Sequence, residues 1–106
     1  VRDHVRAGDL LPNDRGAGAR VLIAFGPEAG LPRAAKERKL YDTIRAQGYC
    51  ALVGDRTAEL AGISAPVFHA DRRLAAAVTL TMPAHRYDAR HIEPVCAAAR
   101  QLSGMI

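Results

Sequence analysis

The chain has 106 residues, of which 49% are hydrophobic and 25% are charged, and its formal net charge is +4. This length suits a single domain, and the composition is typical of folded proteins, which argues against a disordered chain. No apolar run approaches the roughly 18 residues of a membrane-spanning helix, and the N-terminus lacks the apolar core of a signal peptide, so we expect a cytoplasmic protein. The arginines are scattered and aromatic residues are few, so the sequence shows no nucleic-acid-binding surface.

The first third of the chain predicts a short strand followed by a helix. Residues 1–11 fit a strand and a turn, because valines alternate with charged residues before Gly8-Asp9. Asn13 or Asp14 is the expected N-cap of a helix that ends at Phe25. Its apolar stripe, at helical spacing, consists of Ala17, Val21, Leu22 and Phe25.

A second helix is predicted over residues 33–47, with Gly48 as its left-handed stop. Arg38 and Asp42 are spaced for an ion pair on the exposed basic face, which we interpret as solvated rather than as a binding patch. The inward residues are Leu40, Tyr41 and Ile44, and a strand over residues 49–53 follows.

A β-hairpin over residues 60–83 is the most informative stretch. Its strands are predicted at Ile63–His69 and Leu74–Met82, with Pro66 at an edge or an irregularity and a four- or five-residue loop around residues 70–73. Side chains alternate along a strand, so the second strand has one apolar and one small, hydroxylated face. The apolar face consists of Leu74, Ala76, Val78, Leu80 and Met82, and the other face consists of Ala75, Ala77, Thr79 and Thr81. On the apolar face, we expect Leu74, Val78 and Leu80 to be core residues. The hydroxylated face suits a small-molecule pocket.

The chain closes with a helix predicted over Ala89–Ser103, capped by Asp88 and stopped by Gly104. Because Pro94 falls inside this span, the helix either starts later or bends there. Its inner stripe consists of Ile92, Val95, Cys96, Ala99 and Leu102.

No reaction centre emerges from the motifs. The four histidines, His4, His69, His85 and His91, form no metal-ligand pattern, and no nucleophile elbow is present. Cys50 and Cys96 fit buried, reduced thiols better than a nucleophile. We therefore expect binding rather than catalysis, with no catalytic residue, no metal and no cofactor.

Two short segments leave alternatives open. The small residues 16–19 start the first helix without a phosphate-loop motif, and they allow either close helix-on-sheet packing or the approach of a carboxylate to helix N–H groups. Asp55 and Glu59 lie in the loop before the hairpin, where either a solvated turn or a ligand contact would fit.

Several segments, in order, resemble the effector-binding domain of IclR-family transcriptional regulators. The family typically shows a helix of the form "LP…GxGKxxLAF", an "IRxxGY" segment, an "AAPVF" strand and a strand end "SxSGPxxR". The corresponding segments here are residues 8–12 and 15–25, residues 41–49, residues 63–68 and residues 80–87.

This resemblance implies a GAF-like α/β (α+β) domain, with an antiparallel sheet flanked by helices and incomplete at its N-terminus. Residues 1–106 would be the C-terminal part of the effector domain, in a homodimeric or homotetrameric regulator whose winged helix-turn-helix, absent from this chain, contacts DNA. The partner would be a small-molecule effector that carries a carboxylate or an aromatic ring, with no membrane partner.

By position, the resemblance also implies a ligand pocket. This chain has threonines where relatives usually have serines, Leu52 and Gly62 where some have polar or thiol groups, and Asp14 where a His is common, which allows a ligand less polar than a small keto acid. The implied lining consists of Ala17, Gly18, Ala19, Leu52, Asp55, Leu60, Gly62, Thr79 and Thr81.

Two other functions stay in view. A GAF- or PAS-type sensor or dimerisation module of another signalling protein would lack an upstream helix-turn-helix. A small thiol hydrolase would need Cys50 or Cys96 to react rapidly with an alkylating reagent at neutral pH.

Overall fold

The computed structural model describes residues 15–106, so the strand expected over residues 1–11 lies outside the described residues. The N-cap predicted at Asn13 or Asp14 is wrong, because the first helix begins at Ala17 and has Gly16 as its N-cap. The elements are helix α1 (Ala17–Phe25), a 3-10 turn (Pro27–Gly30), helix α2 (Ala35–Gln47), strands β1 (Cys50–Val53), β2 (Leu60–Phe68) and β3 (Leu74–Pro83), 3-10 turns at Ala84–Arg86 and Ala89–His91, and helix α3 (Ile92–Ser103).

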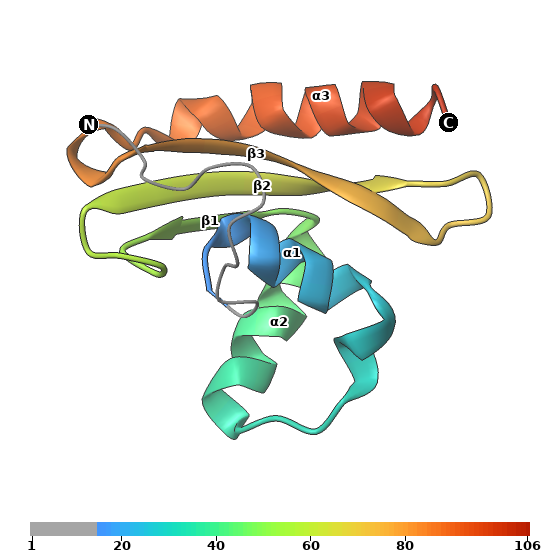
Figure 1. Ribbon diagram of the computed structural model, residues 1–106, viewed down its shortest axis with the longest axis horizontal. Helices are drawn as coiled ribbons and strands as arrows, with labels where there is room; N and C mark the ends of the chain where they lie inside the picture. The colour runs from blue at the N-terminus through green and yellow to red at the C-terminus, as the bar shows by residue number, and fades with distance from the viewer. Residues whose placement is uncertain (1–14) are drawn as a thin grey trace, which may run out of the picture.

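The three described strands form one antiparallel sheet in the order β1-β2-β3, and helices cover both of its faces. Helix α3 lies along one face, whereas α1 and α2 lie on the other (Figure 1). Each face has its own apolar cluster. On one face, Ile63 and Val67 of β2 are buried with Val95 of α3. On the other, Val21 of α1 and Ile44 of α2 belong to a second buried cluster. The predicted α+β class is therefore confirmed.

Strand β2 is central over only part of its length. β1 pairs with Ala61–Ser64 and then ends, so Pro66 lies in a stretch that has β3 as its only neighbour among the described strands. A proline has no N–H to donate to a second neighbour, and the edge position expected for it is confirmed.

The hairpin contains a β-bulge that corrects the predicted faces of its second strand. Val67 lies opposite Ala76 and Phe68 opposite Leu74, which leaves Ala75 as the extra residue. Beyond the bulge, Ala75 packs into the α3-side cluster, and Leu74 lies on the α1 side near Gly26. The assignment of Leu74 and Ala75 to their predicted faces is thus wrong, because one inserted residue inverts the alternation.

Leu80 also departs from its predicted place in the core. Val78 and Met82 pack against the α3-side cluster as expected, but Leu80 is 40% exposed. Helix α3 packs mainly over β2, so it covers the neighbouring strand β3 incompletely.

Helix α1 is rotated relative to the prediction. It starts after Gly16, whose φ of 91° is a left-handed value that favours glycine, and it buries Ala17, Val21 and Ala24. Leu22, predicted to face the core, is 48% exposed, because it borders an open cavity instead of packing into the core.

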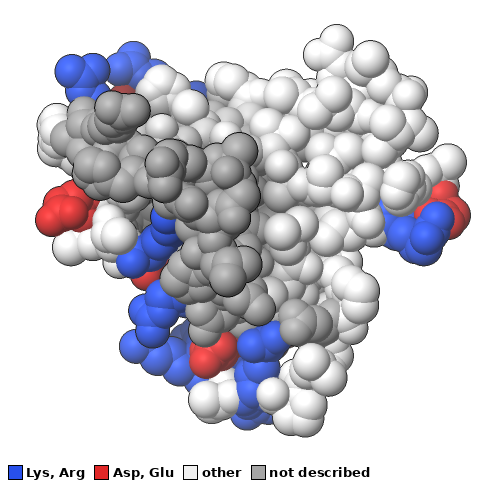
Figure 2. Space-filling model, viewed as in Figure 1, with Lys and Arg blue, Asp and Glu red and all other residues white. Residues whose placement is uncertain are grey.

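Helix α2 buries Tyr41 and Ile44 as predicted and ends at Gly48 with φ 87°. The predicted pair of Arg38 with Asp42 is wrong: Asp42 pairs with Arg45 at 2.6 Å, and Arg45 is also held by the Ala24 carbonyl, to which it donates. The charged residues of α2 gather at the bottom of the molecule in Figure 2, where its basic side chains face solvent.

The C-terminal helix begins later than the predicted start at Ala89, which is one of the two outcomes expected from Pro94. The Asp88 carboxylate accepts the Arg90 N–H and caps a 3-10 turn, after which α3 starts at Ile92 with Pro94 in its first turn, where no intrahelical N–H bond is lost. Val95 and Ala99 are buried as predicted, but Leu102 is 43% exposed, since it lies at the end of the helix.

The hairpin loop over residues 69–73 has the expected length. It is closed by the Arg72 N–H, which donates to the His69 carbonyl, and by the His69 N–H, which donates to the Arg73 carbonyl. Arg72 takes the left-handed conformation that a glycine would adopt more readily.

Candidate functional site

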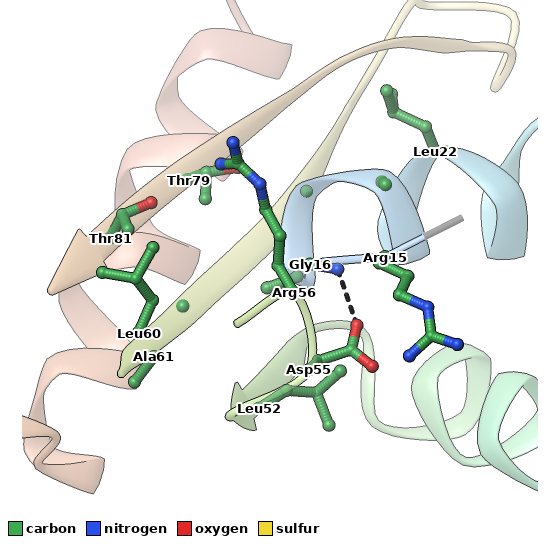
Figure 3. A pocket seen from close by; sticks show the side chains of 14 residues that line it. Arg15, Gly16, Leu22, Leu52, Asp55, Arg56, Leu60, Ala61, Thr79 and Thr81 are labelled. Atoms are coloured by element: carbon green, nitrogen blue, oxygen red, sulfur yellow. Dashed lines mark hydrogen bonds between the residues drawn. The ribbon is translucent and has the colours of Figure 1, made fainter. Parts of the chain in front are cut away.

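A cavity of about 600 Å³ opens between the N-terminus of α1, the β1–β2 loop and the hairpin (Figure 3). All nine residues of the implied pocket line it: Ala17, Gly18, Ala19, Leu52, Asp55, Leu60, Gly62, Thr79 and Thr81. The structure thus brings together segments from four elements, and ligand binding by these residues remains a prediction. The five lining residues that were not predicted are Arg15, Gly16, Leu22, Arg56 and Ala61.

Two glycines bring the first turn of α1 into close contact with the sheet. A Cβ atom on Gly18 would lie 2.9 Å from the Thr79 Oγ1, and one on Gly62 would lie 3.1 Å from the Ala17 Cβ. Close helix-on-sheet packing, one of the two alternatives for residues 16–19, is therefore confirmed. The other alternative, approach of a carboxylate, is compatible with this packing because the same turn also borders the cavity.

A threonine hydroxyl on the floor of the cavity is bonded to a buried serine. The Ser64 and Thr79 side chains share a hydrogen bond of 2.9 Å; Ser64 is fully buried, and Thr79 and Thr81 are exposed to the cavity. The hairpin register contained the signal for Ser64, since this residue lies directly opposite Thr79 on the same face.

Asp55 accepts three hydrogen bonds in the cavity wall. Its Oδ2 accepts the Gly16 N–H at 2.6 Å and the Arg20 Nε–H at 2.9 Å, and its Oδ1 accepts the Arg20 Nη2 at 2.8 Å. Arg20 also donates from Nη1 to the Tyr41 hydroxyl at 2.9 Å. The hydrogen bonds from Arg20, more than any other cause, lower the pKa of Asp55 below its usual value. Neither alternative for the Asp55 loop included this ion pair.

Basic side chains take part in the cavity wall. Arg15 and Arg56 line the cavity, and Asp55, the acidic residue among the described lining residues, is paired with Arg20. The N-terminus of α1 adds the positive end of its dipole, and helix geometry leaves the N–H groups of residues 17–19 without acceptors inside the helix.

Part of the cavity surface is apolar. Leu22, Leu52 and Leu60 contribute this apolar surface. Figure 3 shows the Arg56 side chain running toward Thr79, whereas Arg15 points toward α2. Such a site suits a small anion with an apolar body.

The two cysteines differ in burial within residues 15–106. Burial raises the pKa of the fully buried Cys50 thiol to about 12, and burial also raises the pKa of the partly buried Cys96. No group of three or more His, Cys, Asp or Glu side chains in this described part is arranged to hold a metal ion, and none of its helices is long and apolar enough to cross a membrane.

Comparisons with known proteins place the fold. Residues 34–105 match the C-terminal domain of bacterial IclR transcriptional regulators. No protein of curated function matches the sequence.

Among solved structures, an IclR-family regulator from Rhodococcus sp. is 27% identical, with a TM-score of 0.84 over 99% of this chain and 47% of its own. A regulator C-terminal domain from Vibrio cholerae is 30% identical, with a TM-score of 0.82 over 94% of this chain and 69% of its own. An IclR homologue from Microbacterium hydrocarbonoxydans, solved with 4-hydroxybenzoate, is 23% identical, with a TM-score of 0.81 over 98% of this chain and 50% of its own.

The chain spans about half the length of the Rhodococcus and Microbacterium proteins. Its strands and helices, and the order of its motifs, agree with the family match over most of its length. The chain belongs to the IclR family of bacterial transcriptional regulators and corresponds to part of their C-terminal domain.

Proposed function

We propose that this domain senses a small organic acid in the cavity between α1 and the hairpin. The observation that carries the proposal is the cavity itself, about 600 Å³ in volume, which is lined by apolar side chains together with threonine hydroxyls, the first turn of α1 and basic side chains. This volume falls within the range of about 300–1,000 Å³ found for small-molecule sites. The Microbacterium homologue, which was solved with 4-hydroxybenzoate, supports a single-ring acid as a starting ligand.

In the proposed complex, the acid meets two kinds of surface. Its carboxylate accepts hydrogen bonds from the N–H groups of residues 17–19, aided by the α1 dipole and the neighbouring arginines. Thr79 and Thr81 bind polar substituents, and Leu52 and Leu60 contact the ring or aliphatic body. The acid binds in the orientation that keeps its charge near α1 and its apolar part in the interior.

The effect on DNA follows from a shift between populations. If the acid binds one arrangement of the homodimer or homotetramer more tightly than another, its presence favours that arrangement and changes the spacing of the DNA-binding heads. A winged helix-turn-helix encoded upstream of residue 1 is required by this proposal. Sequencing that region tests it directly, and a sensor module without such a segment would contradict it.

Titration calorimetry with 4-hydroxybenzoate, benzoate and pyruvate tests the site. We expect at least one acid to bind the wild-type chain, and binding to weaken at least tenfold in the Thr79→Val plus Thr81→Val variant. The matched control is Thr43→Val on the outer face of α2, where the hydroxyl contacts only the Lys39 carbonyl. Circular dichroism confirms that each variant is folded at the assay temperature. Failure of all three acids to bind, together with no effect of the threonine changes, would contradict the proposal.

A further inference from the structure

We infer that Asp55 is a positioning residue of the cavity: it holds the N-terminus of α1 against the β1–β2 loop, and its own carboxylate does not contact the ligand. This inference rests on the proposed function, in which the cavity binds a small acid. It assigns a distinct role to a residue that the family resemblance implied only as part of the lining.

The carboxylate of Asp55 is already occupied by the protein. Its two oxygens accept three hydrogen bonds, one from the Gly16 N–H and two from Arg20. The side chains of Arg20 and Asp55 are only 10% and 16% exposed. A bidentate arginine fixes both the position and the plane of a carboxylate, so Asp55 has little freedom to turn toward a ligand.

The bond to Gly16 makes Asp55 a cap supplied from outside the helix. Gly16 is the N-cap of α1, and it has no side chain that could accept a helix N–H. Of the four N–H groups that an α-helix leaves unpaired at its start, Asp55 accepts the first, and the next three belong to residues 17–19 at the cavity. Asp55 therefore sets where those three groups point.

Arg20 gives this arrangement a second anchor and balances its charge. The guanidinium bonds both Asp55 and the Tyr41 hydroxyl, which joins the cavity wall to α2. An unpaired carboxylate at this position would repel an anionic ligand, whereas the Asp55–Arg20 pair presents no net charge.

A ligand-free experiment tests the positioning role first. In the Asp55→Asn variant of the 106-residue chain, we expect the Gly16 amide proton to exchange with solvent at least tenfold faster by NMR, and the Arg20 Nε–H resonance to shift. The control is Asp42→Asn, which removes an exposed Asp–Arg pair on α2 and should change neither signal. Unchanged Gly16 exchange in Asp55→Asn would overturn the inference. Arg20→Lys is the second variant should Asp55→Asn not fold, because lysine keeps the charge and loses the bidentate bond.

A ligand experiment separates positioning from direct contact. We expect Asp55→Asn to weaken 4-hydroxybenzoate and benzoate by the same factor, roughly tenfold or about 1.4 kcal/mol, because the first turn of α1 is displaced for both. If Asp55 instead accepted the ligand hydroxyl, only 4-hydroxybenzoate would lose affinity, and the inference would fail. If neither acid binds the wild-type chain, the proposed function fails for these ligands, and the Gly16 exchange still decides the role of Asp55.

Discussion

Gly18→Ala tests the closest approach in the cavity wall. The added methyl group would lie 2.9 Å from the Thr79 Oγ1, a distance at which one of the two must move. Thr79 borders open space, but moving its hydroxyl away from Gly18 would disturb the hydrogen bond to the fully buried Ser64, and its β-branched side chain has few alternative rotamers. The substitution therefore sets the better helix propensity of alanine against a clash and a strained hydroxyl pair.

The two opposing effects can be estimated. Alanine in place of glycine stabilises a helix by about 0.5–1 kcal/mol, and overpacking costs about 1–3 kcal/mol. We expect Gly18→Ala to lower the free energy of unfolding by up to about 2.5 kcal/mol. In a Thr79→Ala background the clash is absent, and the same change should raise stability by about 0.5–1 kcal/mol. The double-mutant cycle should thus show a coupling of about 1–3 kcal/mol.

Urea unfolding followed by circular dichroism measures the four corners of this cycle. Gly30→Ala is the matched control, because nothing lies within 4 Å of a Cβ at that position. The control should leave stability nearly unchanged or raise it slightly. If Gly18→Ala stabilises the wild-type chain as much as the Thr79→Ala chain, the close contact between α1 and β3 does not exist in solution.

Three further predictions concern other parts of the chain. Folding lowers the pKa of Asp55, so its contribution to stability is complete above about pH 4 and is lost as the pH falls through the lowered pKa. Asp55→Asn should therefore reduce the loss of stability at acid pH, and an unchanged acid limb of the stability–pH profile would refute this. Cys96 should react with iodoacetamide before Cys50, whose burial raises its pKa to about 12, and rapid alkylation of Cys50 at neutral pH would revive the thiol-enzyme alternative. Gly48→Ala should lower the free energy of unfolding by about 1–2 kcal/mol in thermal unfolding, because the φ of 87° at this position strains a residue with a side chain even though no atom lies near its Cβ position. A neutral result would mean that α2 ends in another conformation.

Local sequence signals predicted most of the fold. Helical spacing located the buried residues of α2 and α3, and Pro94 indicated the late start of α3. The misplacement of Leu74 has a different origin: a bulge depends on how two strands are paired, and a period-two reading of one strand cannot detect it. Leu22 was misplaced because its exposure depends on the rotation of α1 against a sheet that lies far away in sequence.

The sequence predicted many of the residues that line the cavity, but not the hydrogen bonds and the ion pair between them. The family resemblance named nine of the fourteen residues that line the cavity, and the hydroxylated face of β3 was visible in the alternation of residues 74–82. The ion pair of Arg20 with Asp55 was missed, since the two residues are 35 positions apart and Arg20 occupies a helix position between apolar residues. The sequence signal that could have revealed this pair is an arginine between apolar residues on a predicted helix, since a buried arginine needs a partner. In the structure Arg20 is 8% exposed.

The long separations across the cavity bear on the order of folding. Strands β2 and β3 are joined by the short loop over residues 69–73, whereas the bond from Gly16 to Asp55 closes a span of 39 residues. Short loops close at lower entropic cost, so we expect the hairpin to form early and the cavity to close after the transition state. An acid that binds the closed cavity would then slow unfolding and leave the folding rate unchanged, which stopped-flow kinetics with and without the acid would show. If the proposed function holds, the bound acid would stabilise the folded state by lowering its unfolding rate.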